Sequence, residues 1–324
     1  MSAAQTILDP LVRSAWAAAE RAATDSGVEI GLVDSAAGAH AISEVLATIW
    51  PQDNGAPPLE ANLIRALQFA GNYVAMATRP ADSPAAATAG LPSTPMQSPS
   101  GEVIGACVGF FGAPAASHMH SHIAGITTAA AGRGGGRALK LHQRAWCLDR
   151  GITTISWTFD PLVSRNAHVN LVRLGATATR FIPDFYGDMI DLRNSGQASD
   201  RLVVDWVLRS EAVVALGDGV RHFGDVLERA REGGFEWITV DGGEPSTAQE
   251  GATSMANADR SEVRRCFIRV PLDIEALREA DPQLAARWRL RVREAFERTL
   301  GDQRSNWTVI GFDKSVGYIL EEQS

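Results

Sequence analysis

The stretch His122-Ile-Ala-Gly-Ile-Thr-Thr128, with Arg133-Gly-Gly-Gly-Arg-Ala138 shortly after it, decides the fold of this 324-residue chain. The first part predicts a strand, and the second predicts a Gly-rich turn that opens a helix running to about Asp149. Such a turn offers free backbone N–H groups at a helix N-terminus, where they and the helix dipole bind a phosphate or pyrophosphate. Glycines suit this task because a Cβ atom would hold the anion away from the backbone. A Gly-rich surface turn with no ligand is the alternative.

Two common phosphate-binding motifs do not fit this turn. A P-loop requires GxxxxGK[ST], and no Lys-Ser or Lys-Thr follows the glycines. A dinucleotide-binding fold requires GxGxxG, but the pattern started by Gly132 and Gly134 meets Arg137 where the last glycine should be. The turn therefore predicts a phosphate site of another kind.

The elements around the turn indicate an α+β chain. Strands that form hairpins come first, and a β-α-β-α-β order follows them, which is typical of a layered α/β domain and excludes a repeat protein. The strands expected up to residue 210 are 28–33, 72–78, 103–111, 119–126, 153–159, 177–182 and 202–208. The helices expected there are 10–24, 39–49, 60–69, one that follows the Gly-rich turn at 132–136 and runs to about residue 149, and 164–173, the last opened by a Ser164 cap. Beyond residue 210 we expect helices at 219–231 and 282–301 and strands at 235–240, 266–270, 307–312 and 316–320.

This pattern predicts three regions along the chain. Residues 1–27 form an N-terminal helix that begins at Asp9-Pro10, and residues 28–210 form the main domain. Residues 79–101 hold five prolines among Ala, Ser and Thr, which predicts a flexible insertion within that domain. Residues 211–324 form a smaller C-terminal α/β region. This region is a separate domain, a degenerate second copy of the main fold or a dimerisation element.

Composition limits the classes of protein that the chain can belong to. With 45% hydrophobic and 21% charged residues it matches an ordinary soluble globular protein. A net charge of -8 argues against a general nucleic-acid binder, which needs a basic surface. The three cysteines lie far apart with no CxxC pair, and Met1 to Asp9 resembles no signal peptide, so we expect a cytoplasmic location.

One apolar stretch has the length of a membrane span but not its composition. Residues 103–132 contain no acidic residue, lysine or arginine. They do contain three histidines, a proline and several glycines, which favour two buried strands joined by a turn. We therefore expect no membrane association.

Within the turn, Arg133, Gly136 and Ala138 satisfy the pattern [RQ]xxGx[GA], and on this motif the sequence resembles the GNAT superfamily of acyl-CoA N-acyltransferases. Further segments resemble one bacterial GNAT subfamily of predicted acetyltransferases whose members carry a C-terminal extension. These segments are Trp157-Thr-Phe-Asp-Pro-Leu162, Arg165-Asn-Ala167, Leu174-Gly-Ala176, Asp184-Phe-Tyr-Gly187 and Ser199-Asp-Arg-Leu202. The resemblance spans about residues 28–210.

The resemblance implies a fold and a cosubstrate. GNAT proteins have a mixed, mostly antiparallel central sheet in which two parallel strands splay apart, and the pantetheine of acyl-CoA lies in the gap like an added strand. The implied cosubstrate is acetyl-CoA or another acyl-CoA. The residues implied to bind it are Ile126, Thr127 and Thr128 for the pantetheine, Arg133, Gly134, Gly135, Gly136, Arg137 and Ala138 for the pyrophosphate, and Asn166 on the second side.

The resemblance also implies catalytic residues. A backbone N–H of the first splayed strand would stabilise the oxyanion formed when an amine attacks the thioester. Tyr186 matches the family's tyrosine acid, and a buried aromatic with a satisfied hydroxyl is the alternative. His122, or a water that it holds, is the expected base.

Three other features have both a functional and a structural interpretation. His118, His120 and His122 alternate along one strand and so share a face, which suits a zinc site, but no acidic ligand accompanies them and we expect no metal. Asp160 follows a strand end, where it orients a substrate ammonium or caps an Asp-Pro turn. Cys107 lies in an apolar strand, where a buried thiol is inert.

The helix at 282–301 carries several arginines. They form either a basic face for the 3′-phosphate of CoA or a solvated face that pairs with acidic groups elsewhere, and we favour the second. Leu284, Trp288 and Phe296 are expected to face the core.

The sequence thus predicts an acyltransferase that joins an acyl group from acyl-CoA to the primary amine of a small molecule, by direct attack in a ternary complex. An amino acid acylated by acetyl-CoA or succinyl-CoA is the first substrate hypothesis, with Arg165 or Arg180 available for its carboxylate. The alternatives are an acyl-CoA-binding sensor or scaffold without turnover, and a CoA-thioester enzyme of another reaction type. No nucleic-acid or membrane partner is expected, and a homodimer is one possible assembly.

Overall fold

The computed structural model describes residues 9–80, 101–113, 116–187, 198–220, 236–238, 264–301 and 305–322. Most of the predicted insertion at 79–101 and most of the helix predicted at 219–231 lie outside these residues. By contacts the chain divides into two units, one with residues 1–156, 190–193 and 207–220 and one with residues 157–189, 194–206 and 221–324. This division differs from the boundary at residue 210 that the sequence suggests, and the domain assignment remains a prediction.

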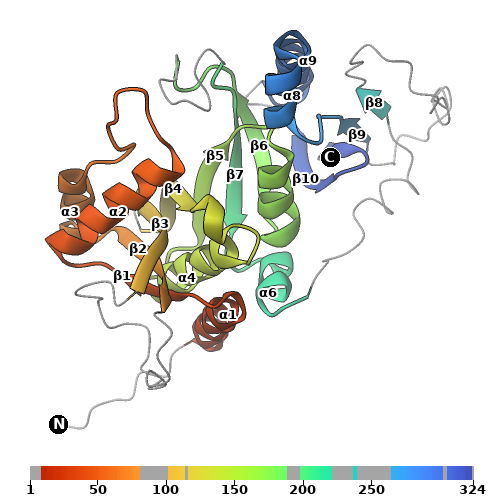
Figure 1. Ribbon diagram of the computed structural model, residues 1–324. Helices are drawn as coiled ribbons and strands as arrows, with labels where there is room; N and C mark the ends of the chain where they lie inside the picture. Colours follow the sequence, from red (N-terminus) through yellow and green to blue (C-terminus); the bar gives the residue numbers. More distant parts are fainter. Residues whose placement is uncertain are drawn as a thin grey trace, which may run out of the picture. The chain divides into compact units, whose positions relative to one another are not determined.

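The first unit is built on strands in the order β1-β2-β3-β4-β5 (Figure 1). Neighbouring strands are antiparallel from β1 to β4, and β4 and β5 are parallel. The strands are β1 (Glu29–Leu32), β2 (Tyr73–Pro80), β3 (Gly101–Phe111), β4 (His118–Ile126) and β5 (Thr154–Phe159), which starts in this unit. The apolar stretch from residue 103 thus forms two strands, as predicted. None of the helices described here has the length and hydropathy that a membrane span requires.

Helices of the first unit begin and end where the sequence provides caps. They are α1 (Pro10–Ser26), α2 (Ala36–Ile49), α3 (Ala61–Phe69), α4 (Gly135–Asp149) and α6 (Glu211–Gly217), with a 3₁₀ turn η1 (Thr128–Ala130). Asp9 caps α1 by accepting the Leu11 N–H at 2.9 Å, and Gly27 ends the helix at φ 64°. Ser35 accepts the Gly38 N–H at the start of α2. The short helix α6 was not predicted from the sequence.

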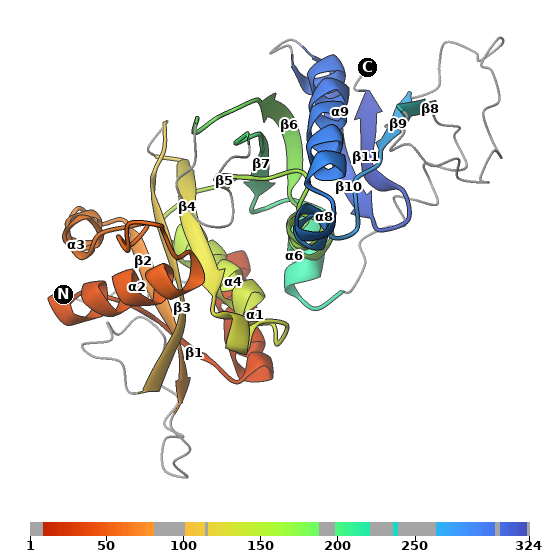
Figure 2. The same cartoon turned by 45° about the horizontal axis from the view of Figure 1, so that its top comes forward.

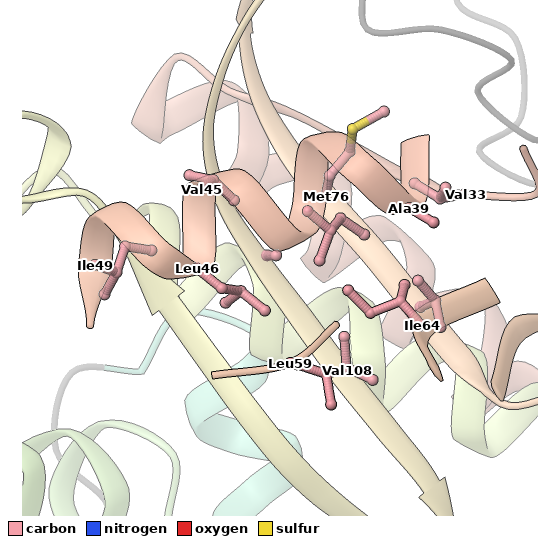
Figure 3. Close-up of a cluster of buried hydrophobic side chains, with 12 residues drawn as sticks. Val33, Ala39, Val45, Leu46, Ile49, Leu59, Ile64, Met76 and Val108 are labelled. Atoms are coloured by element: carbon pink, nitrogen blue, oxygen red, sulfur yellow. The ribbon is translucent and has the colours of Figure 1, made fainter. Parts of the chain in front are cut away.

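The central strands β2 and β3 are apolar on both faces because helices cover both sides (Figure 2). On one face, α2 and α3 pack against Val74 and Met76 of β2 and Val108 of β3, in the cluster drawn in Figure 3. On the other face, Tyr73 of β2 contacts His142 and Trp146 of α4. Successive side chains of a strand point to opposite faces, so β2 contributes to both layers and fixes α4 against the sheet.

The second unit contains strands in the order β7-β6-β10-β11-β9-β8. They are β6 (Thr177–Ile182), β7 (Arg201–Val207), β8 (Glu236–Ile238), β9 (Arg265–Ile268), β10 (Trp307–Asp313) and β11 (Gly317–Glu322). All recorded pairs are antiparallel except β8 with β9. The helices are α5 (Ser164–Ala167), a π-helix η2 (His168–Arg173), α8 (Ile274–Ala280) and α9 (Pro282–Leu300). β10 pairs directly with β6, so the described C-terminal strands lie in the same sheet as β6 and β7.

Helix α9 packs on this sheet through Phe296, which stacks on Phe181 and meets Tyr318 edge to face. Phe296 is buried as predicted, whereas Leu284 and Trp288 are only half-buried. The predicted cap at Ser164 is wrong, because Ser164 lies inside α5 and its hydroxyl donates to the Pro271 carbonyl at 2.6 Å.

The mixed, mostly antiparallel sheet with one central parallel pair confirms the predicted α+β fold class.

Candidate functional site

Strand β4 runs on past the end of its ladder with β5. The recorded pairs are His118 with Thr154, Met119 with Ile155 and His120 with Ser156, and among the described residues the ladder stops there. β4 continues to Ile126 while remaining paired with β3. Beyond His120, no recorded pair among the described residues joins β4 to β5, so the edge of β4 opposite β3 has backbone groups that can bind an extended ligand.

The direction of the backbone groups at the end of β4 follows from one hydrogen bond. The Thr127 N–H donates to the Ile104 carbonyl of β3 at 2.8 Å, so it is not available to a ligand. Because successive N–H groups of a strand point to opposite edges, the N–H and C=O of Ile126 point away from β3. Of the three predicted pantetheine-binding residues, Ile126 has the suitable backbone direction and Thr127 does not, and Thr128 begins the turn η1, where its carbonyl accepts the Ala131 N–H.

A β-bulge interrupts β4 at His122. Val108 pairs with Ile123 and the next residue of β3, Gly109, pairs with Ser121, so His122 is the extra residue. A bulge bends and twists its strand and turns a backbone group out of the ladder. The predicted base therefore lies at the point where β4 departs from regular geometry.

The two histidines next to the bulge are kept neutral by their surroundings. His120 and His122 flank Phe110, with ring centroids 5.1 and 5.7 Å from it. Burial lowers the pKa of His120 to about 4, with the neighbouring His122, His118 and Lys140 adding to the effect. Burial also lowers the pKa of His122. Partial burial thus favours the neutral imidazole of His122, whose unprotonated nitrogen a general base requires.

The Gly-rich turn forms an exposed helix N-terminus. Gly132 and Gly134 adopt φ of 79° and 94°, which side chains other than glycine rarely tolerate. Helix α4 starts at Gly135, and its first recorded helical bond joins the Ala138 N–H to the Gly134 carbonyl. The N–H groups of Gly135 and Gly136, in the first turn of the helix, are placed to bind an anion. The Ala138 N–H itself is used by the helix.

At positions 135 and 136 of the turn, neither the backbone conformation nor the packing requires glycine. Neither Gly135 nor Gly136 has a positive φ. A Cβ atom on Gly135 would make an ordinary contact with Ile126 Cδ1 at 3.4 Å, and one on Gly136 would meet only Ile126 Cγ1 at 3.9 Å. Glycine is unfavourable in a helix, so these residues indicate that something outside the described chain approaches the backbone here. The same contacts place Ile126 beside the turn.

The two arginines of the turn differ. Arg133 is exposed. Arg137 is half-buried and its guanidinium donates to the Leu216 carbonyl at the end of α6, at 2.6 Å. Arg137 therefore anchors α4 to α6 through its side chain, and Arg133 is the cation of the turn that remains exposed.

These features are ones that the resemblance implies: a short parallel ladder, a bulge on its first strand and a Gly-rich turn opening the next helix. The arrangement is consistent with the expected GNAT-like sheet.

Comparison with solved structures returns acetyltransferases that resemble part of this chain. The ribosomal-protein-S18-alanine N-acetyltransferase of Escherichia coli is 11% identical, with 56% of this chain and 94% of that chain covered and a TM-score of 0.41. A GNAT family acetyltransferase from Elizabethkingia anophelis with acetyl-CoA bound is 12% identical, with 56% and 98% covered and a TM-score of 0.38. Ard1 from Thermoplasma volcanium is 13% identical, with 55% and 96% covered and a TM-score of 0.38. No family model and no curated protein matches the sequence.

Lys140 was not predicted from the sequence. It is a buried lysine of α4 that lies behind the bulge of β4. Its Nζ donates to Ser121 Oγ and to Gln143 Oε1, both at 2.9 Å, and Ser121 Oγ donates to Gln143 Oε1 at 3.0 Å. Burial lowers the pKa of Lys140 to about 8. The three side chains fix Ser121 from the buried face of β4, directly before His122. Lysine is usually exposed on helices, so the sequence pattern offered no signal for this role.

The metal interpretation of the three histidines gains no support within the described part of the chain, where no group of three or more His, Cys, Asp or Glu could hold a metal ion. His118 Nε2 lies 2.7 Å from Ser156 Oγ. Cys107 is buried, and desolvation raises its pKa, which favours the inert thiol expected from the sequence.

In the second unit, Asp160 lies in a buried ion pair. Its two carboxylate oxygens accept hydrogen bonds from Arg289 of α9 at 2.8 and 2.6 Å, and Arg278 lies 3.3 Å away. Oδ1 also accepts the Leu162 N–H at 2.9 Å. Burial raises the pKa of Asp160, but the hydrogen bond and charge of Arg289 outweigh it and the pKa is lowered. These contacts favour the structural interpretation of Asp160 over an ammonium-binding role.

Two arginines of α9 differ from the solvated face that the sequence predicts for this helix. Arg289 is buried rather than solvated, with 5% of its surface exposed, and Arg293 binds Asp200. Their partners, Asp160 and Asp200, lie directly after β5 and directly before β7. The isolated sequence could not indicate this pairing because it joins residues more than 90 positions apart.

The remaining predicted residues of the second unit are exposed. Asn166 lies in α5, and its backbone N–H donates to the Val163 carbonyl. Tyr186 lies in a turn after β6 and is 47% exposed, so it is not the buried aromatic that was its alternative. Their roles toward acyl-CoA stay predictions.

Proposed function

We propose that this protein is an acyl-CoA-dependent N-acyltransferase that acylates the primary amine of a small molecule. The observation that supports this best is the pair of glycines at 135 and 136, which neither backbone geometry nor packing requires. They lie at a helix N-terminus with free N–H groups, next to Ile126 at the end of β4. A diphosphate followed by an extended pantetheine fits this combination of donors.

The chain's own residues fit such a cosubstrate in stated ways. The N–H groups at the start of α4 would bind the pyrophosphate, with Arg133 adding charge. The outward N–H and C=O of Ile126 would bind the amide groups of the pantetheine. When bound, acyl-CoA supplies an activated acyl group, and the thioester sulfur of CoA is the leaving atom.

His122 would hold or remove the proton of the attacking amine, directly or through a water, since its lowered pKa keeps the imidazole neutral. A backbone N–H released by the bulge would stabilise negative charge on the carbonyl oxygen. Tyr186 would return a proton to the sulfur as the C–N bond forms and the C–S bond breaks.

The test is release of free thiol from acetyl-CoA and succinyl-CoA by the full-length protein, in the presence of a panel of amines that includes amino acids. The proposal expects thiol release that depends on the amine and is matched by amide formation. CoA binding without thiol release across the panel would favour a sensor or scaffold. Thiol release without amide would favour a different thioester reaction.

A further inference from the structure

The turn that carries Tyr186 contains a strained residue. Asp184 has a φ of 48°, and within the described ranges it is the one non-glycine residue with a positive φ. Asparagine and aspartate tolerate this region better than other side chains, but it still costs energy unless surrounding contacts impose it. Such strain is therefore informative only if the contacts that hold it can be named.

Two residues just before β7 hold the turn. The Tyr186 N–H donates to Ser199 Oγ at 2.8 Å, and the Phe185 N–H donates to the Ser199 carbonyl at 3.1 Å. The Asp184 N–H donates to Asp200 Oδ1 at 3.0 Å, and Asp184 Oδ1 in turn accepts the Ser199 N–H at 3.2 Å. Backbone N–H groups of three consecutive turn residues are thus bound by one dipeptide.

Asp200 is in turn fixed by helix α9. Arg293 donates from Nη2 to Asp200 Oδ1 at 2.6 Å and from Nε to Oδ2 at 3.1 Å, a bidentate pair. Asp200 is 1% exposed, and Arg289 lies 3.9 Å from its other side. The charge of Asp200 is therefore held in one orientation, with Oδ1 shared between Arg293 and the N–H of Asp184.

The fixed turn presents an exposed side chain rather than a buried one. Tyr186 is about half exposed, its ring meets Phe185 edge to face, and the guanidinium of Arg201 lies 5.1 Å from its centroid. Core packing does not require Tyr186 to be immobile, because so much of it faces solvent. A network this dense around an exposed phenol indicates that the position of the phenol matters.

We propose that Arg293, in the C-terminal region, is a positioning residue that holds the 183–187 turn through Asp200 and thereby sets the place of Tyr186. This inference rests on the proposed function, in which Tyr186 is the proton donor. It assigns the C-terminal extension a catalytic purpose: α9 orients the acid of the main domain without touching a substrate. Arg293 acts through Asp200 and Asp184, so its loss should alter the turn and leave the Gly-rich turn at 132–136 unchanged.

The experiment compares Arg293→Met with Arg287→Met, an exposed arginine of the same helix. With full-length protein, Arg293→Met should lower kcat about 10-fold or more, but not below the kcat of Tyr186→Phe, while KM for acyl-CoA changes less than about 2-fold. In the double variant Arg293→Met/Tyr186→Phe, kcat should equal that of Tyr186→Phe alone. Arg287→Met should match the wild type, and Arg293→Lys should recover part of the loss.

A second measurement is independent of turnover. Amide hydrogen exchange in a peptide covering 183–187 should be faster in Arg293→Met than in Arg287→Met or the wild type. Unchanged exchange there, or kcat losses that multiply in the double variant, would overturn the inference. If Tyr186→Phe leaves kcat unchanged, the acid role in the proposed function fails, and the exchange result still decides whether Arg293 orders the turn.

Discussion

Replacing Arg289 by methionine should strongly destabilise the second unit. The substitution removes both hydrogen bonds to Asp160 and leaves a carboxylate that is 8% exposed without its main partner. Breaking one side of a buried ion pair typically costs about 3–5 kcal/mol, because the remaining charge stays desolvated. Arg278 at 3.3 Å and the Leu162 N–H still contact Asp160, so we expect the lower end, about 3 kcal/mol.

The assay is urea unfolding followed by tryptophan fluorescence, with Arg287→Met as the exposed control. The control should change the free energy of unfolding by less than about 0.5 kcal/mol. Asp160→Asn combined with Arg289→Met should be less destabilising than the sum of the single variants by about 1 kcal/mol or more, since residue 160 no longer has a charge that Arg289 must balance. A cost of Arg289→Met no larger than that of Arg287→Met, or strict additivity, would refute the buried-pair account.

The same pair predicts a pH dependence. The pKa of Asp160 is lowered in the folded wild type, so the pair stabilises the fold at pH values above the ordinary pKa of about 3.9 and this stabilisation is lost as the pH falls through the folded pKa. In Arg289→Met, the charge of Arg289 no longer opposes the effect of burial, so the pKa of Asp160 should be raised. Acidification should then increase the free energy of unfolding of the variant, because the buried carboxylate becomes protonated. The difference in unfolding free energy between the two proteins should therefore shrink from pH 7 to pH 3.

Three further predictions concern the candidate site. Tyr186→Phe should lower kcat about 100-fold with little change in the Kd for CoA, and steady-state kinetics with calorimetry checks this; an unchanged kcat would remove Tyr186 from the mechanism. Gly136→Glu should raise the Kd for CoA at least about 100-fold by charge and bulk, whereas Ala66→Glu on exposed α3 should not; equal Kd values would place the diphosphate elsewhere. The pKa of Lys140 is lowered to about 8 in the folded state, so between about pH 8 and about pH 10.4 the folded state binds fewer protons than the unfolded state. The free energy of unfolding should therefore rise with pH in this range, by up to about 3 kcal/mol. Chemical denaturation of Lys140→Met should lack this rise, and an identical rise in both proteins would contradict the prediction.

Elements with local signals were predicted well from the sequence. The Asp281-Pro282 start and the Gly301 end of α9 agree with the structure, and so does β6 at Thr177–Ile182. In these cases a cap, a proline or a β-branched run determines the element within a few residues. The short helices α6 and α8 were missed because each has only seven residues and little periodicity.

Features that depend on distant partners were not predictable. The bulge at His122 arises from the register between β3 and β4, which a single strand pattern does not contain. Asp160 had the local signature of a turn aspartate, and its turn bond to Leu162 is present, but its binding to Arg289 depends on a helix about 130 residues later. Lys140 likewise needed β4 to reveal its partners.

The Gly-rich turn was the most informative part of the sequence, and its helix-terminal geometry is present as expected. The sequence could not indicate which residues of the turn make contacts within the chain and which can bind a ligand. The structure assigns the Arg137 side chain to α6 and the Ala138 N–H to the helix, and we expect Arg133 and the N–H groups of Gly135 and Gly136 to bind the ligand.

The most direct test of the account is isothermal titration of the full-length protein with CoA and with acetyl-CoA, repeated with Gly136→Glu. We expect saturable binding at one site per chain that the substitution abolishes while the fold, followed by circular dichroism, is retained. No heat with either compound, or equal binding by the substituted protein, would contradict the assignment of the turn to a CoA diphosphate.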